Sequence, residues 1–566
     1  MPTSTRPIAD IARELGLGAE EWLPYGRDKA KVLLSALAAR SGQPDGKLVV
    51  VSSITPTPAG DGKTTMTIGI GQALARIGAK PVIALREPSI GPTLGMKGGG
   101  TGGGRAQVVP MEDINLHFTG DFHAVTSAHN LLAAAVDNHL HHGNALGMDV
   151  RQVLWRRVLD VNDRALREVV VGLGGRLDGV PREGGFYITS ASEIMAVLCL
   201  AEDMADLKAR LGRMVVALRP DGSPVLADQL KVTGAMAALL RDAIHPNLVQ
   251  TMEGTPALVH GGPFANIAHG CNSVVATRMA LKLGEICLTE AGFASDLGAE
   301  KFFDIKCRLA GLRPDAAMVV ATVRALKYHG GIPVPELGRE NVEALVRGLD
   351  NLEAHVEAVR QFKVPLLIGL NRYPTDTEAE YKAVLDRCAA LGVSAYVADV
   401  FGQGGEGGED LARGLLKLLE SERSGFAPLY PLDAPIKEKL ETIATRVYGA
   451  DGVDYPRRVD RQIAQAESLG YGRLPVCVAK TQRSLSDEPT LLNRPRGFRG
   501  HRERRANLRG SGLPRGAGGR HHHHAGAAAQ AQRGGRRRDG GGDDHGSLLS
   551  RVIYCAMVRA VTLPIQ

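Results

Sequence analysis

A short loop near the N-terminus contains the residue types that bind nucleotide phosphates. Residues 55–65 read Thr-Pro-Thr-Pro-Ala-Gly-Asp-Gly-Lys-Thr-Thr and follow the mainly apolar run of residues 47–51. In such a strand–loop–helix unit, backbone N–H groups and the positive helix end bind the phosphates, the lysine neutralises charge and the next hydroxyl holds Mg²⁺. The usual pattern has a glycine five residues before Gly62, where this chain has Thr57. The alternative interpretation is therefore a Gly/Pro surface turn with a solvated lysine.

An arginine and a glycine-rich run follow the next expected strand. Arg86 and Glu87 come directly after the strand predicted over residues 81–85. An arginine at a strand's carboxyl end, one connection from a phosphate loop, is placed for bidentate contact with a carboxylate or phosphate. A structural ion pair of Arg86 with an acid is the alternative. Residues 98–104 contain six glycines, which cost backbone entropy unless a ligand or another segment approaches closely.

Acidic residues and histidines are concentrated over residues 111–129. The candidates are Asp113, His117, Asp121, His123 and His129. The histidines are six residues apart, which suits neither one helix face nor the spacing of a zinc finger. We predict hydrogen-bonding roles near the active site or simple structural roles, with metal ligation as the less favoured alternative.

Two later strands are each followed by a loop with an aromatic residue. The strands are expected over residues 364–370 and 395–400, and Tyr373 and Phe401 follow them. Aromatic residues make up only 4% of the chain. One at the mouth of each strand is suited to stacking on a flat heterocycle; the alternative is that either ring belongs to the core.

The elements that hold these loops alternate between strand and helix. A strand over residues 48–52, a helix over 64–78 and a strand over 81–85 predict a parallel sheet with phosphate chemistry at its strand ends. Residues 151–250 are predicted to be mostly helical, with a helix over 192–211. We therefore predict an α/β fold, with a P-loop NTPase-like parallel sheet core and additional α/β domains.

The composition is that of a globular protein with two or three domains. The chain has 566 residues, 44% of them apolar and 23% charged. It has no run of eighteen apolar residues and no signal-peptide core near its start, so we expect no membrane association and a cytoplasmic location. The seven cysteines include no C-x-x-C pair, which argues against a disulfide framework and fits a reducing compartment.

The net charge of +7 comes from the C-terminal tail. From Gly500 onward there are twelve arginines and four acidic residues, so the first 499 residues carry a charge of −1. A nucleic-acid partner would depend on the tail alone, and we expect none.

Taken together, these segments closely resemble the formate–tetrahydrofolate ligase family over about residues 25–499. The similar stretches are residues 54–65, 86–92, 106–120, 155–167, 289–308, 324–331, 371–377, 404–408 and 479–499. The resemblance includes the threonine at position 57, which the family's own phosphate loop has. It implies ATP-dependent joining of formate to N10 of tetrahydrofolate through formyl phosphate, giving 10-formyltetrahydrofolate, ADP and phosphate in one-carbon metabolism.

The resemblance also implies roles for individual residues. Lys63 would neutralise charge during phosphate transfer and Thr64 would lie near Mg²⁺. Arg86 would hold formate and then formyl phosphate, with Glu87 orienting it, and Asp121 is a candidate for polar contact or proton handling at the reacting amine. The residues that would bind the ATP phosphates are Thr57, Pro58, Ala59, Gly60, Asp61, Gly62, Lys63 and Thr64.

The folate site and the assembly are further implications. Tyr373 and Phe401 would sandwich the pterin, with Phe293 nearby. Family members are typically homotetramers activated by a monovalent cation (K⁺ or NH₄⁺), and we expect a homotetramer here if the C-terminus is intact. The domains would be a nucleotide-binding domain with a helical insertion over residues 1–370, a folate-site region over 371–499 and a tail over 500–566 that is foreign to the family.

The tail is best explained by a shifted reading frame. A back-translation of residues 519–528, read one base later, encodes Gly-Asp-Ile-Ile-Thr-Met-Pro-Gly-Leu-Pro, which is close to a family segment. We therefore interpret residues 500–566 as disordered, out-of-frame sequence; an affinity tag or metal-binding tract and a nucleic-acid-binding tail are the alternatives. Two other functions stay open: a catalytically impaired product that has lost its native C-terminal segment, and a regulatory P-loop ATPase of the partitioning type.

Overall fold

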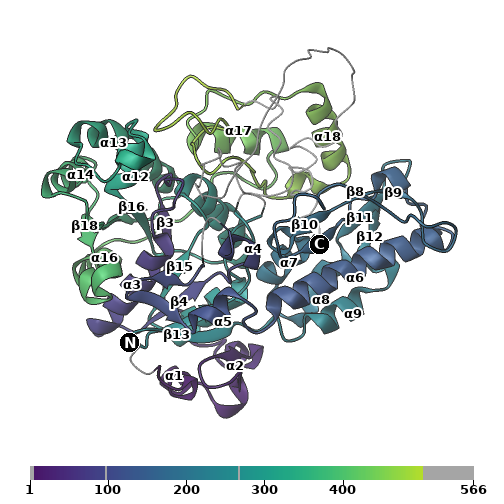
Figure 1. Ribbon diagram of the computed structural model, residues 1–566, viewed down its shortest axis with the longest axis horizontal. Coiled ribbons are helices and arrows are strands. Elements are labelled where there is room, and N and C mark those ends of the chain that lie inside the picture. Colours follow the sequence, from purple (N-terminus) through teal and green to yellow (C-terminus); the bar gives the residue numbers. More distant parts are fainter. Residues whose placement is uncertain (1–4, 96–98, 266–267, 501–566) are drawn as a thin grey trace, which may run out of the picture.

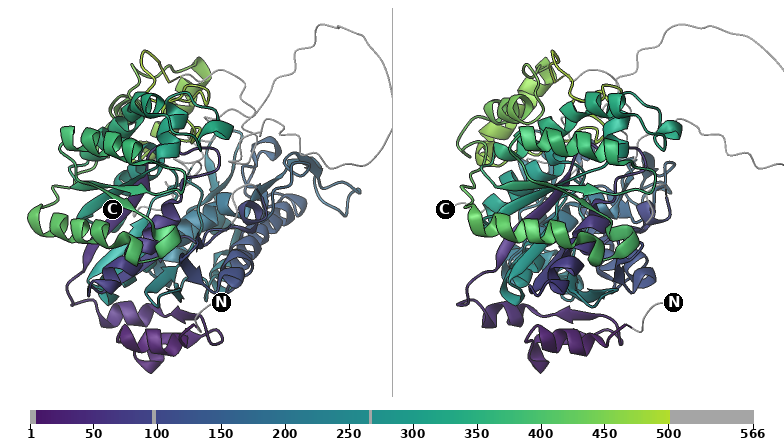
Figure 2. Two further views of the ribbon diagram at one scale, coloured as in Figure 1. Left: turned by 60° about the vertical axis from the view of Figure 1, so that its left-hand side comes forward. Right: turned by 90° about the vertical axis from the view of Figure 1, so that its left-hand side faces the viewer.

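The protein is built around a large, mostly parallel β-sheet with helices on both faces (Figures 1 and 2). The computed structural model describes residues 5–95, 99–265 and 268–500. The sheet has twelve strands within these residues. Ten of them lie in the order β1 (Trp22–Pro24), β2 (Ala30–Val32), β13 (Asn247–Thr251), β14 (Pro256–Val259), β4 (Pro81–Leu85), β15 (Ile286–Glu290), β3 (Lys47–Ser53), β16 (Ala316–Ala321), β17 (Leu366–Asn371) and β18 (Ala395–Ala398).

The strands from β14 to β18 are all parallel, whereas the first four strands of the order pair antiparallel. In β15, Leu288 is paired with Val49 of β3 and with Ile83 of β4. The remaining two strands, β5 (Gly102–Gly103) and β6 (Ala106–Val109), form a hairpin beside β13. This register brings the carboxyl ends of the parallel strands to one edge, where α/β proteins bind their ligands.

Alternate residues of β3 enter two different hydrophobic cores. Val49 and Val51 pack with residues of α3 (Lys63–Arg76) and α16 (Glu409–Ser421). Leu48 and Val50 pack on the other face of the sheet, with residues of α10 (Val274–Leu283) and α13 (Val342–Arg360). Burial on both faces explains why β3 reads as a continuous apolar run.

The remaining helices of the sheet region are shorter and flank its strands. They are α1 (Ile8–Glu14), α2 (Leu34–Ala39), α4 (Ile90–Thr93), α5 (Met111–Asn115), α11 (Arg308–Ala310), α12 (Val323–His329), α14 (Glu378–Ala390) and α15 (Val400–Gln403). Two π-helical turns, Ser295–Ala299 and Phe302–Cys307, follow β15.

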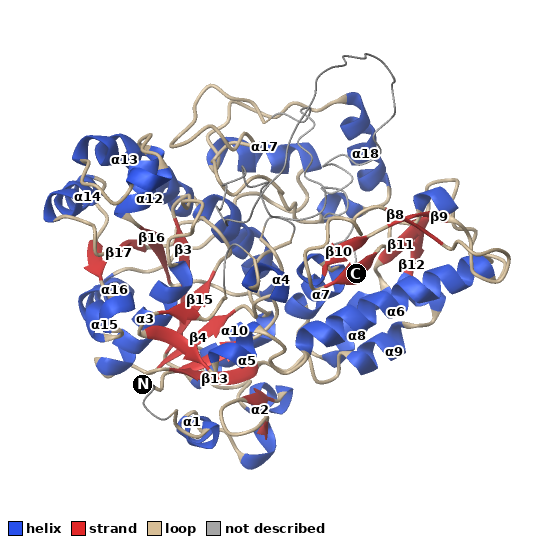
Figure 3. Ribbon diagram, viewed as in Figure 1, coloured by secondary structure: helices blue, strands red, loops and turns tan. Residues whose placement is uncertain are grey.

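The segment between β6 and β13 forms a unit with its own core, on the right in Figures 1 and 3. Its helices are α6 (Asp121–His141), α7 (Glu193–Leu200), α8 (Met204–Gly212) and α9 (Thr233–Leu239). Its strand pairs are β7 (Arg157–Leu159) with β10 (Phe186–Ile188), β8 (Val169–Val171) with β9 (Arg182–Gly184), and β11 (Val215–Leu218) with β12 (Pro224–Leu226).

This unit corrects the prediction that residues 151–250 are mostly helical, since short strands alternate with its helices. The single helix predicted over residues 192–211 is also wrong. Asp203 accepts a hydrogen bond from the backbone N–H of Asp206 at 2.8 Å and so caps the start of α8, which separates it from α7. A residue that caps a helix in this way favours the start of a new helix over continuation of the preceding one.

The C-terminal part of the described chain packs on the same core as α13. It contains α17 (Ile436–Arg446) and α18 (Arg457–Ser468), whose Ile443, Val459 and Ile463 belong to that core. Residues 501–566, where the sequence predicts a disordered, out-of-frame tail, lie outside the described residues.

The mixed α/β prediction and the mostly parallel sheet are confirmed. The predicted strand over residues 81–85 is β4, and the predicted helix after the phosphate loop is α3. Classification as a P-loop NTPase-like fold and the domain boundary at residue 370 stay predictions; the sheet itself continues through β17 and β18. Within the described ranges, no helix combines the length and apolar character needed to cross a membrane.

Candidate functional site

The phosphate loop connects β3 to α3 at the carboxyl edge of the sheet. Gly60 and Gly62 adopt left-handed φ values of 86° and 73°, which explains why glycines stand there. The buried carboxylate of Asp61 accepts hydrogen bonds from the backbone N–H of Thr57 at 2.8 Å and from the hydroxyl of Thr322 at 2.9 Å. Thr57 therefore helps to fold the loop around Asp61, and its φ is not positive, so glycine is not needed at this position.

The two residues after the loop point toward the end of β15. The ammonium group of Lys63 donates hydrogen bonds to the carbonyl oxygens of Ala291 and Phe293, the latter at 3.2 Å. The hydroxyl of Thr64 donates to Oε2 of Glu290 at 2.8 Å. Glu290 is 4% exposed and is the last residue of β15, the strand beside β3. The sequence reasoning missed Glu290, although it lies in the similar stretch of residues 289–308.

Phe293 has an unusual backbone conformation. Its φ is 59°, in the left-handed region that bulky residues rarely adopt. Its carbonyl oxygen accepts hydrogen bonds from Lys63 and from the hydroxyl of Ser53 at 3.2 Å, which hold it toward the phosphate loop. Strain of this kind is concentrated at functional sites. The structure thus places the backbone of Phe293 at the loop, while contact of its ring with a substrate stays a prediction.

Arg86 reaches the same carboxylate as Thr64. Its Nε lies 3.9 Å from Oε1 of Glu290, and its Nη1 donates to the carbonyl oxygen of Pro263 at 3.2 Å. A Cβ added at Gly292 would approach Nη1 to 3.1 Å, so the guanidinium lies close over that glycine. Glu290 therefore links the phosphate loop to Arg86, and the side chain of Arg86 is still 25% exposed.

Glu87 is buried beside a second group of charged residues. Burial raises the pKa of Glu87 well above its usual value, and the negative charges of Asp121 and Asp160 add to this effect. No hydrogen-bond partner of its Oε2 is found in the part of the chain that the structure describes. This position therefore favours the neutral carboxylic acid form of Glu87.

Asp121 belongs to a buried ion pair. Lys31 donates hydrogen bonds to its two carboxylate oxygens at 2.8 and 3.0 Å, and the side-chain amide of Asn247 donates to it at 2.8 Å. Lys31 also donates to Oδ1 of Asn247 at 2.9 Å. The structure therefore places Asp121 close enough to influence Glu87 through its charge, and direct contact with a substrate stays a prediction.

His129, one of the three histidines in residues 111–129, lies in the core. His129 stacks on Trp155 with ring centroids 4.2 Å apart, and its ring nitrogens contact the hydroxyl of Ser192 and the carbonyl oxygen of Arg156. Burial lowers the pKa of His129 to about 3, so it acts as a neutral core residue. Over the described ranges, no three or more His, Cys, Asp or Glu side chains gather in a way that could hold a metal ion.

The two predicted stacking residues each have one side covered by protein. The Phe401 ring is 58% exposed and lies against the glycine-rich run: a Cβ added at Gly103 or Gly104 would come within 3.2 or 2.8 Å of ring carbons. The backbone N–H of Arg105 also donates to the carbonyl oxygen of Phe401 at 2.9 Å. Glycine is therefore required at positions 103 and 104 because another segment of the chain approaches closely. Approach of another segment and approach of a ligand were the two explanations that the sequence allowed.

Tyr373 lies near the phosphate loop, after β17. The guanidinium carbon of Arg324 is 5.0 Å from its ring centroid. Burial raises the pKa of Tyr373 to about 12. The side-chain amide of Asn371, two residues earlier, donates to the carbonyl oxygen of Asp61 at 3.0 Å, which ties the end of β17 to the loop. A sandwich of one ligand between Tyr373 and Phe401 stays a prediction.

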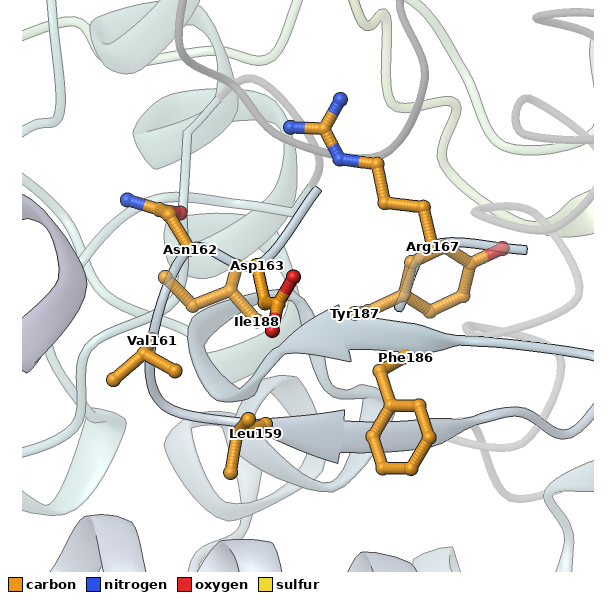
Figure 4. A pocket seen from close by; sticks show the side chains of 8 residues that line it. All are labelled: Leu159, Val161, Asn162, Asp163, Arg167, Phe186, Tyr187 and Ile188. Atoms are coloured by element: carbon orange, nitrogen blue, oxygen red, sulfur yellow. The ribbon is translucent and has the colours of Figure 1, made fainter. Parts of the chain in front are cut away.

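A shallow hollow lies apart from these residues, between the ends of β7 and β10 (Figure 4). It borders the segment after Arg86, because Asp160 accepts hydrogen bonds from the hydroxyl of Ser89 at 2.6 Å and the backbone N–H of Ile90 at 3.1 Å. The residues that line it are Leu159, Val161, Asn162, Asp163, Arg167, Phe186, Tyr187 and Ile188. None of the candidate catalytic or binding residues predicted from the sequence is among them.

The site thus has two sides at the carboxyl edge of one sheet. On one side, Thr64 and Arg86 contact Glu290, and Lys63 binds the carbonyl groups just after it. On the other side of the phosphate loop, Tyr373 and Phe401 follow β17 and β18. A family model described as formate–tetrahydrofolate ligase matches residues 2–513 of the chain. The match covers nearly the whole chain and ends before most of the Arg/Gly/His-rich tail.

Proposed function

The chain belongs to the formate–tetrahydrofolate ligase family, and we propose that it joins formate to tetrahydrofolate in two chemical steps, through formyl phosphate. The observation that carries this proposal is that Thr64 and Arg86 both contact Glu290, while Lys63 binds the backbone carbonyl groups that follow it. It supports a phosphate-transfer site after β3 and a carboxylate-binding arginine after β4, with only β15 between the two strands. Activation of a small carboxylate by ATP requires these two groups close together.

The first step activates formate. A formate oxygen attacks the γ-phosphorus of ATP, the bond to the β-phosphate oxygen breaks, and ADP leaves. The loop N–H groups and the Lys63 ammonium group offset the charge that develops on the phosphoryl oxygens, while Arg86 holds the formate carboxylate by its planar fork. The product is a mixed anhydride, whose formyl carbon is a far better electrophile than that of formate.

The second step transfers the formyl group. N10 of tetrahydrofolate attacks the formyl carbon, the bond to the phosphate oxygen breaks, and N10 loses its proton as phosphate leaves. We assign Glu87 to orienting the anhydride, with a proton on its carboxyl group that Oε2 can share with a substrate oxygen. Asp121 then handles protons indirectly, since its charge favours the protonated form of Glu87.

The residues around Thr64 fit a Mg²⁺ ion bound together with ATP. The hydroxyl of Thr64 and the carboxylate of Glu290 are 2.8 Å apart and are both hard oxygen ligands of the kind that Mg²⁺ prefers. We propose that these two residues hold the ion, which would neutralise phosphate charge. Activation by a monovalent cation and assembly as a homotetramer stay predictions for this chain.

The pterin is assigned to Tyr373 and Phe401. Phe401 is exposed on the side away from the glycine-rich run, and Tyr373 follows the neighbouring strand. Stacking on both rings would bring the substrate amine toward the phosphate loop from the side opposite Arg86. The resulting arrangement separates recognition of the folate from activation of formate.

The test is an assay of the purified full chain for 10-formyltetrahydrofolate, ADP and phosphate. We expect equal amounts of the three products, and only when formate, tetrahydrofolate and ATP are all present. Lys63→Ala should lower turnover by about 100- to 1,000-fold or more while tetrahydrofolate still binds. The control is Lys80→Ala, because Lys80 is exposed and paired with Glu285 at the surface.

Two outcomes would contradict the proposal. ATP hydrolysis that proceeds without formate and tetrahydrofolate would favour a regulatory ATPase. Binding of ATP and tetrahydrofolate without product would favour the impaired product that the altered C-terminal sequence suggests.

A further inference from the structure

Arg324 lies between the two sides of the site and has no role in the proposal so far. It is the second residue of α12, which follows β16, and β16 pairs with β3 on one side and β17 on the other. Thr322, two residues earlier, donates its hydroxyl to Asp61 of the phosphate loop at 2.9 Å. Arg324 is thereby held at the strand end that separates the phosphate loop from Tyr373.

The Arg324 guanidinium lies over the ring of Tyr373, with its central carbon 5.0 Å from the ring centroid. Among the described residues, this guanidinium has no hydrogen bond and no ion pair. Its positive charge lowers the pKa of both Asp61 and Tyr373, against the larger effect of burial. Arg324 therefore interacts with the loop through its charge and with Tyr373 through stacking.

The backbone of Tyr373 is fixed independently of its ring. Its N–H donates to Oδ2 of Asp376 at 2.9 Å, and the same oxygen accepts a hydrogen bond from the hydroxyl of Tyr381 at 3.2 Å. This turn sets the position of the Tyr373 backbone but leaves the side-chain torsions free. The Arg324 guanidinium lies over one face of the ring and restrains it from that side.

We propose that Arg324 is a positioning residue for the folate substrate. It holds the Tyr373 ring in one orientation before the substrate binds. The uncovered face of the ring can then stack on the flat pterin, and the ring loses no further rotational freedom. This inference rests on the proposed function, because it assumes that Tyr373 binds the pterin. It assigns a role to the similar stretch of residues 324–331, which the mechanism had not used.

The experiment compares Arg324→Gln and Arg324→Lys in the wild-type chain and in a Tyr373→Leu background. Dissociation constants for tetrahydrofolate and ATP are measured by calorimetry under reducing conditions, and the kinetics give KM and kcat. We expect Arg324→Gln to weaken tetrahydrofolate binding about 3- to 10-fold. Arg324→Lys should restore part of the loss, since an ammonium group also stacks but without the planar fork. ATP affinity and kcat should stay within about twofold.

The double variant separates positioning from direct contact. If Arg324 acts through Tyr373, Arg324→Gln should cause no further loss in the Tyr373→Leu background. Lys437→Gln removes another cation stacked 5.0 Å from a tyrosine centroid, at the surface, and should leave tetrahydrofolate affinity unchanged. Thermal unfolding of each variant shows whether it remains folded.

Several results would overturn the inference. Additive losses in the double variant would mean that Arg324 contacts the substrate itself, and an equal loss of ATP affinity would place it in the nucleotide site. Unchanged tetrahydrofolate affinity in Arg324→Gln would mean that the ring needs no support. A wild-type chain that binds no tetrahydrofolate would instead refute the proposed function and the inference with it.

Discussion

Replacing Gly104 by alanine should weaken tetrahydrofolate binding, although Gly104 is assigned no contact with any substrate. Gly104 has a φ of 60°, and an added Cβ would lie 2.2 Å from the carbonyl oxygen of Phe401 and 2.8 Å from the first carbon of its ring. Both distances are too short for real atoms, so one segment must move. The glycine-rich run is paired into the sheet through β5 and β6, and we therefore expect Phe401 to move.

The size of the effect follows from three contributions. A left-handed alanine costs about 1–2 kcal/mol relative to glycine, and an overpacked contact costs about 1–3 kcal/mol. Together these are enough to displace a ring that is 58% exposed and anchored mainly through its backbone. Loss of one stacking partner is worth about 1–3 kcal/mol, so tetrahydrofolate affinity should fall about 5- to 150-fold.

The assay is a pair of binding titrations, one with tetrahydrofolate and one with ATP, and only the first should change. Gly16→Ala is the matched control: its φ is 67°, and no described atom beyond its chain neighbours lies within 4 Å of an added Cβ. It carries the same backbone strain without the clash. Unaltered tetrahydrofolate affinity in Gly104→Ala, or an equal loss in Gly16→Ala, would refute the reasoning.

Two further predictions concern buried carboxyl groups. Glu290→Gln keeps the size of the side chain but removes its charge, and it should weaken Mn²⁺ binding in the presence of ADP about 10- to 100-fold. Mn²⁺ binding is measured by electron paramagnetic resonance. Equal Mn²⁺ affinity in the two proteins would exclude Glu290 as a ligand. Burial raises the pKa of Glu193 from 4.5 to about 8, so its contribution to stability is complete below pH 4.5 and is lost as pH rises through 8. The free energy of unfolding is measured in urea at a series of pH values. Between pH 4.5 and 8 it should fall by up to about 5 kcal/mol more in the wild type than in Glu193→Gln. Parallel pH profiles of the two proteins would contradict this prediction.

The elements around the phosphate loop could be predicted because their signals are local. The apolar run of β3, the left-handed glycines at 60 and 62 and the periodicity of α3 lie within about thirty residues of one another. Each element is specified by neighbours in sequence, so composition and spacing are sufficient. The strand ahead of Arg86 was predictable for the same reason.

The residues that complete the site could not be predicted in this way. Glu290 is an ordinary acid at the end of an ordinary strand, and only its pairing beside β3 brings it to Thr64. Likewise, Lys31 lies in the short strand β2, and nothing nearby in sequence indicates that it neutralises Asp121. The break between α7 and α8 was missed because the apolar periodicity on both sides hides the cap at Asp203.

The position of β3 in the sheet also determines when the nucleotide site can form during synthesis. Both neighbours of β3 are late in the chain: β15 starts at Ile286 and β16 at Ala316. At translation rates of about 5–20 residues per second, the ribosome needs on the order of 10 to 50 seconds after completing β3 before β15 begins to appear. Until then a strand whose central residues 48–51 are all apolar has no partner in its sheet. Exposed strands of this kind are prone to aggregate. The phosphate loop is thus among the first functional segments to be made and among the last to be assembled, so chaperone protection should matter most in the middle of translation.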